Sequence, residues 1–72
     1  GMAYMSKLIN DLVGKQCIIR SEFIFSFAGK TELSCKIIDA DDEWIKICYT
    51  EKKDKQVVKL MRIENIESIE EQ

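Results

Sequence analysis

Short runs in which apolar and polar residues alternate, separated by polar turns, dominate the sequence. In "WIKICYTE", Ile45, Ile47 and Tyr49 fall on one side of the chain, and Trp44 and Lys46 fall on the other. A period of two is typical of a β-strand with one buried face, and clusters such as "DDE" and "KKDK" are typical of turns. The pattern predicts five short antiparallel β-strands, over about residues 16–27, 32–40, 44–51, 56–62 and 65–70.

A short helix is expected before the first strand, over about residues 6–13. Ser6 is a favourable N-cap, and Gly14 suits the position that follows a helix end. One apolar stripe of this helix consists of Leu8, Ile9, Leu12 and Val13. A helix and five strands within residues 1–72 predict a single, mostly-β domain, and closure into a small barrel would remove the exposed strand edges.

The chain is short for an independent domain. A chain of 72 residues buries only roughly 60% of the surface that it exposes when unfolded, so disulfides, a metal or oligomerisation usually add stability at this size. The three cysteines, Cys17, Cys35 and Cys48, are widely spaced, and the chain has no histidine. Buried, reduced thiols in a cytoplasmic protein are therefore expected, with no metal site and no cofactor. Oligomerisation is the expected source of further buried surface.

Charge is unevenly distributed, although the formal net charge is only −2. Residues 51–62 include five basic and two acidic side chains, whereas residues 63–72 include four glutamates and no basic residue. The low net charge argues against nucleic-acid binding over the whole surface. No apolar run approaches the ~20 residues that cross a bilayer, so no membrane contact is expected.

Two short motifs resemble those of the Sm-like (LSm and Hfq-type) protein family. The stretch "DEWIKIC", from Asp42, resembles the end of the first Sm motif, and "MRIENIESI", from Met61, resembles the second. The resemblance covers the chain from the helix onward and implies a strongly bent, five-stranded SH3-like barrel. It also implies a homo-oligomeric ring in which the fourth strand of one subunit pairs with the fifth strand of the next, here about residues 57–62 and 65–69.

The resemblance further implies an RNA-binding site beside the centre of such a ring. Trp44 takes the position of the aromatic residue that stacks on a base, and Arg62 takes that of the motif's arginine. Asp42 matches the aspartate of the first motif, and Lys46 stands where the family has asparagine. Lys59 is a further electrostatic candidate near the same rim.

The chain also departs from the family pattern. Lys46 cannot accept a hydrogen bond as an amide does, and Ile63, in place of a loop glycine, does not favour a positive φ. Specific readout of uridine is therefore not expected. The glycine at which the family's second strand bends aligns near Lys36, so this strand is expected to bend less or to bend by a bulge.

Two functions stay open on these residues. One is a non-catalytic homo-oligomeric module that binds RNA weakly, by stacking on Trp44 and by attraction to Lys46 and Arg62. The other is a protein–protein adaptor or structural oligomer, in which Trp44 packs against a neighbour and Arg62 forms an ion pair with Glu64 or Asp42. Catalysis is not expected, because the chain has neither a histidine base for a nucleophile nor a Gly-rich phosphate loop.

Overall fold

The computed structural model describes residues 3–72, and their side chains from Lys7 onward. The two α-helices are α1 (Ala3–Asn10) and α2 (Glu22–Ala28). The five strands are β1 (Gln16–Arg20), β2 (Glu32–Ala40), β3 (Trp44–Glu51), β4 (Lys55–Arg62) and β5 (Ser68–Glu71). Two 3-10 turns, η1 (Lys52–Asp54) and η2 (Ile63–Asn65), stand on either side of β4. No helix in this part of the chain is long and apolar enough to cross a membrane.

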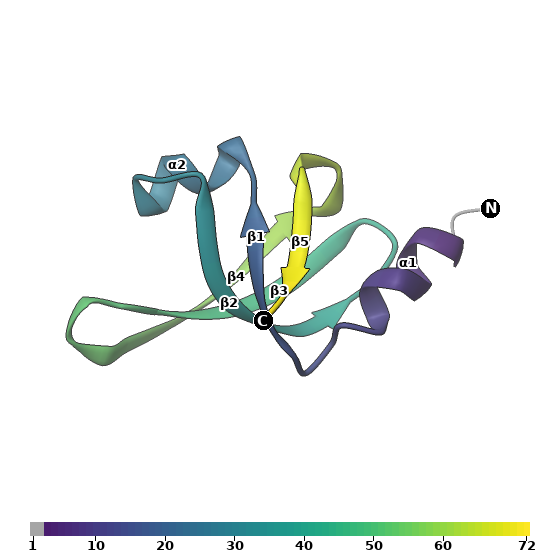
Figure 1. Ribbon diagram of the computed structural model, residues 1–72, viewed down its shortest axis with the longest axis horizontal. Coiled ribbons are helices and arrows are strands. Elements are labelled where there is room, and N and C mark those ends of the chain that lie inside the picture. The colour runs from purple at the N-terminus through teal and green to yellow at the C-terminus, as the bar shows by residue number, and fades with distance from the viewer. Residues whose placement is uncertain (1–2) are drawn as a thin grey trace.

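The five strands form one antiparallel sheet in the order β4–β3–β2–β1–β5 (Figure 1). The last strand returns to lie beside the first, whereas β4 stays at the opposite edge. Within residues 3–72 no ladder joins β4 to β5, so the sheet is unclosed and has two free edges. The prediction of a mostly-β fold with five antiparallel strands is confirmed.

The strand alternation predicted from the sequence decides which side chains are buried. Ile45, Ile47 and Tyr49 of β3 lie in the core, while Trp44 and Lys46 lie on the outer face. The rest of the core comes from β1, α2, β2 and β4, namely Cys17, Ile19, Ile24, Leu33, Cys35, Ile37 and Met61. The turn after α1 packs on this core, together with the last part of the helix, through Ile9, Leu12 and Val13.

The first helix begins earlier than the sequence suggested. It spans Ala3–Asn10, so Ser6 lies within the helix and is not its N-cap. Turns follow from Asp11, and Gly14 ends them with φ +88° while its N–H donates to the Ile37 carbonyl at 2.7 Å. Leu8, predicted to share the apolar stripe, is 71% exposed. Gly14 therefore directs the chain into the sheet, as a residue with positive φ can, but the α-helix itself has already ended.

The strand predicted over residues 16–27 is wrong in its second half. It stops at Arg20, and α2 follows. Ser21 Oγ accepts a hydrogen bond from the Phe23 N–H at 3.1 Å, and Gly29, with φ +71°, donates its N–H to the Phe25 carbonyl. These are a helix N-cap and C-cap. The prediction failed here because the alternating phenylalanines fit a strand, while Phe23 and Phe27, four residues apart, also fit one face of a helix. On α2 these two rings meet edge-to-face, at 5.7 Å between ring centroids.

A β-bulge interrupts the pairing of β2 with β3. Ile37 pairs with Ile47, but the next pair is Asp39 with Lys46, so Ile38 is the extra residue. The bulge lies two positions beyond Lys36, where the family's bending glycine was expected. It also reverses the alternation: Ala40 pairs with Ile45 and packs on the core, whereas an uninterrupted period of two would put Ala40 on the same face as Ile38.

The three cysteines differ in accessibility, which predicts how they react. Cys17 and Cys35 are fully buried and lie opposite each other on β1 and β2. Burial, and then the neighbouring Cys17, raise the pKa of Cys35 to about 12. At pH 8 roughly one Cys35 in 10⁴ is then ionised. We expect a thiol-specific disulfide reagent to modify half-buried Cys48 in the native protein and the other two only after unfolding. Rapid modification of all three native thiols, followed by absorbance, would contradict this burial.

Candidate functional site

The most distinctive cluster of side chains lies at the β2–β3 turn and the end of β4. Trp44 begins β3 and pairs directly with Arg62, the last residue of β4. The Arg62 guanidinium carbon lies 4.6 Å from the centre of the Trp44 ring, which is cation–π geometry. Arg62 Nη1 also lies 3.6 Å from Glu43 Oε2. Trp44 keeps 37% of its surface exposed, so the ring is supported by Arg62 and still accessible.

Asp41 fixes the backbone on which Trp44 stands. Its Oδ1 accepts hydrogen bonds from the backbone N–H groups of Glu43, at 2.9 Å, and Trp44, at 2.7 Å. The Asp41 N–H in turn donates to the Trp44 carbonyl at 2.9 Å. The bonds from Glu43 and Trp44 lower the pKa of the Asp41 carboxyl below its usual range, because they favour the charged form. The turn that "DDE" predicted is thus closed by a carboxylate and orients the aromatic ring.

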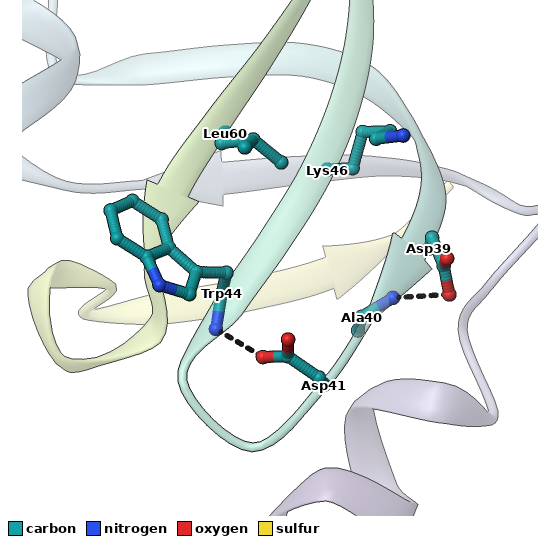
Figure 2. A pocket seen from close by; sticks show the side chains of 6 residues that line it. All are labelled: Asp39, Ala40, Asp41, Trp44, Lys46 and Leu60. Atoms are coloured by element: carbon teal, nitrogen blue, oxygen red, sulfur yellow. Dashed lines mark hydrogen bonds between the residues drawn. The ribbon is translucent and has the colours of Figure 1, made fainter.

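A pocket of about 240 Å³ opens beside Trp44 on the outer face of the sheet (Figure 2). Trp44 and Lys46 both border it, because residues two apart on a strand share a face. Leu60 of β4, which pairs with Lys46, forms the apolar part of the wall. We name this the Trp44 pocket, and its lining residues are Asp39, Ala40, Asp41, Trp44, Lys46 and Leu60.

The structure brings together three of the five residues proposed from the sequence. Trp44 and Lys46 line the Trp44 pocket, and Arg62 supports the Trp44 ring. Asp42 lies exposed in the turn and is not part of the pocket lining. Lys59 lies on the opposite face of β4, with its Nζ 4.2 Å from the centre of the Phe27 ring, so it does not join this group. Arg62 does form an ion pair, but with Glu43 and not with Glu64 or Asp42.

Asp39, Asp41 and Leu60 were not proposed from the sequence. Asp41 belongs to the turn motif that the sequence indicated, and Leu60 falls on the same side of its strand as Arg62. Asp39 reaches this face only because of the bulge at Ile38. The charged groups that line the pocket are therefore two carboxylates and one ammonium group, so the pocket itself is not electropositive. A flat ring can rest on Trp44 and offer hydrogen-bond donors to the carboxylates.

Within the described residues, no group of three or more histidine, cysteine, aspartate or glutamate side chains is placed to hold a metal ion. Comparison of the chain with protein-family models, with curated protein sequences and with solved structures found no match.

Proposed function

We propose that the chain is a non-catalytic, self-assembling binding module of the Sm-like kind, in which β4 of one subunit pairs with β5 of the next. The observation that carries this proposal is the pair of free edges that the unclosed sheet leaves at β4 and β5. An edge strand exposes unpaired N–H and C=O groups, and pairing with another chain satisfies them. The free edges are also where the resemblance to Sm-like proteins implies subunit contact.

The charges on the two edge strands support a head-to-tail arrangement. β4 carries three basic residues, Lys55, Lys59 and Arg62, and no acidic residue. β5 carries Glu70 and Glu71 and no basic residue. Two β4 edges would repel each other, and so would two β5 edges, whereas β4 against β5 is attractive. A repeated head-to-tail contact closes into a ring when its rotation permits.

Burial of apolar surface between subunits is expected to stabilise the assembly further. Val58 and Leu60 project from the outer face of β4 and are 59% and 53% exposed. Burying such side chains contributes roughly 25 cal/mol for each Å² removed from water. Light scattering tests the assembly: a mass equal to a ring of about six or seven subunits supports the proposal. A mass equal to one 8.4 kDa chain at every concentration overturns it.

The ligand that we propose for the module is single-stranded RNA, held by one base at the Trp44 pocket. Trp44 presents a supported, partly exposed ring, and stacking on an aromatic ring tolerates any base. The exocyclic amino groups of bases suit Asp39 and Asp41 as acceptors, while Lys46 suits a phosphate or a base carbonyl. Because two carboxylates line the pocket, the affinity is expected to be low. It is expected to fall as salt rises, because salt weakens the attraction of the RNA phosphates to Lys46 and Arg62.

Trp44→Ala is expected to weaken RNA binding about tenfold or more, because it removes the stacking surface. Fluorescence anisotropy of a labelled short RNA pool measures the affinity of each variant and of the unmodified protein. Trp44 is the chain's single tryptophan, so quenching of its fluorescence also reports the contact directly in the unmodified protein. The matched control is Phe25→Ala, which removes a 62%-exposed aromatic ring from α2 and is expected to leave the affinity unchanged. Absence of binding at low salt would favour the protein adaptor, the alternative that the net acidity of the chain supports.

A further inference from the structure

A second pocket lies on the other face of the sheet, between α2 and the distal half of the β3–β4 hairpin. Its volume is about 410 Å³, within the range of small-ligand sites. It shares no lining residue with the Trp44 pocket. We name it the Tyr49 pocket; the residues on which its chemistry depends are Phe27, Lys30, Leu33, Tyr49, Glu51 and Lys52. In Figure 1 the hairpin extends beyond the rest of the sheet at this end, away from α1.

Aromatic side chains build one wall of the Tyr49 pocket. The Phe27 and Tyr49 rings lie 5.7 Å apart between centroids, and Phe23 stands edge-on to Phe27 at the same distance. Lys59 Nζ lies over the Phe27 ring at 4.2 Å. Phe27 is therefore held by contacts from α2, β3 and β4, which orders the wall before any ligand arrives. Together with Leu33, the wall offers apolar area to a flat or branched hydrocarbon group.

The Tyr49 hydroxyl has no hydrogen-bond partner within the part of the chain that the structure describes. Tyr49 is 6% exposed, and among the described residues its hydroxyl makes no hydrogen bond. Buried tyrosine hydroxyls usually have a partner, because an unpaired one loses its bond to water. Burial, and then the nearby Glu51 charge, raise the pKa of Tyr49. The group therefore remains protonated near neutral pH and is available as a hydrogen-bond donor.

The charged residues of the pocket favour an anionic ligand. Lys30 and Lys52 line it, and neither forms an ion pair with a described residue. Glu51 is the one acidic residue of the lining, so the lining retains a net positive charge. A donor hydroxyl, two ammonium groups and an apolar wall together match a molecule with an apolar body and a single carboxylate.

We propose that the Tyr49 pocket binds a small apolar carboxylic acid, such as an aryl carboxylate. The hydrocarbon body rests against Phe27 and Leu33, and the carboxylate accepts the Tyr49 hydroxyl proton in a hydrogen bond. Lys30 and Lys52 neutralise its charge. This site does not depend on self-assembly or on RNA binding at the Trp44 pocket.

Titration of the ¹⁵N-labelled protein with 2-naphthoate, followed by NMR, tests the site. Chemical shifts of Ala28, Leu33 and Thr50 are expected to move and saturate, while those of Ala40 and Lys46 stay. The neutral analogue 2-naphthylmethanol is expected to bind at least about fivefold more weakly, because it lacks the charge. Tyr49→Phe is expected to weaken 2-naphthoate binding roughly tenfold, and Lys30→Gln with Lys52→Gln by a similar factor. The control Lys36→Gln, on β2 and outside the lining of both pockets, is expected to leave the affinity for 2-naphthoate unchanged.

Three outcomes would overturn the proposal. The first is the absence of a saturable chemical-shift change up to about 10 mM 2-naphthoate, a concentration above the dissociation constant of specific binding. The second is equal affinity for the acid and the alcohol, or unchanged affinity in Tyr49→Phe. The third is a shift of the same amides on raising the protein concentration alone, which would assign the pocket to a second copy of the chain. Unchanged shifts of amides in β1 and β5 confirm that each variant is folded.

Discussion

Replacing Val58 with proline is expected to separate the proposed ring into folded single subunits. At the end of β4 the Ile63 N–H donates to the Glu43 carbonyl at 2.9 Å. Hydrogen-bonded and non-hydrogen-bonded pairs alternate along an antiparallel ladder, so Arg62, Leu60 and Val58 occupy non-hydrogen-bonded positions. Their backbone N–H and C=O groups point to the free edge. Proline at position 58 therefore removes an outward donor without removing a hydrogen bond to β3.

Light scattering and circular dichroism together check this prediction. The mass is expected to fall to that of one chain, while the β-sheet signal is retained. Val58→Thr is the matched control, because threonine keeps both the outward N–H group and the β-branched shape. An assembly of unchanged mass in the proline variant would show that β4 is not the subunit contact. Loss of the β-sheet signal would instead show that the backbone at position 58 does not tolerate the fixed φ of proline.

Replacing Ser21 with alanine is expected to lower the free energy of unfolding more than the loss of any other single hydroxyl group would. Ser21 is fully buried; its Oγ caps α2 at the Phe23 N–H and donates to the Asn65 carbonyl at 2.6 Å. The second bond joins residues 44 positions apart and ties the start of α2 to η2. Loss of a helix cap together with a buried hydrogen bond costs about 2–3 kcal/mol. That is a large fraction of the roughly 4–10 kcal/mol expected for a domain of this size.

Urea unfolding measures this loss. The midpoint urea concentration is expected to fall by about 2 M, because the free energy of unfolding decreases by about 1–1.5 kcal/mol for each M of urea. Ser26→Ala is the matched control on the same helix. The Ser26 hydroxyl donates to the Phe23 carbonyl at 2.7 Å from an exposed position, so its removal is expected to change stability by less than about 0.5 kcal/mol. A Ser21→Ala midpoint equal to that of Ser26→Ala would contradict the role given to the Asn65 contact.

Most of the fold could be predicted from the sequence, because strand alternation is a local property. The inner residues of β3 and the first part of β2 followed their period of two, and the turns matched clusters of aspartate and lysine. The largest exception was α2, since Phe23, Phe25 and Phe27 satisfy a strand period as readily as Phe23 and Phe27 satisfy a helix period. The Ser21 side chain caps α2 and also bonds to the Asn65 carbonyl far along the chain, a contact that the local sequence does not show.

The candidate site was less predictable, because it depends on register. That Trp44 meets Arg62 follows from the pairing of β3 with β4, and the turn alone does not set which residues face each other. Lys59 was grouped with Lys46 on charge, but strand parity places it on the other face, over Phe27. The Tyr49 pocket had no sequence signal, since it arises from the way α2 packs beside the extended hairpin.

The bulge at Ile38 reverses, within a single strand, which side chains point toward the core. Leu33, Cys35 and Ile37 point inward, and an uninterrupted count would send Asp39 inward as well. An unpaired carboxylate in that core would lose its hydration and either take up a proton or unfold the strand end. One additional residue instead leaves Asp39 in water beside Lys46 and turns Ala40 toward Ile45. The same residue that shifts the register of β2 against β3 thus makes the lining of the Trp44 pocket net negative, so strand pairing and recognition cannot change independently in this chain.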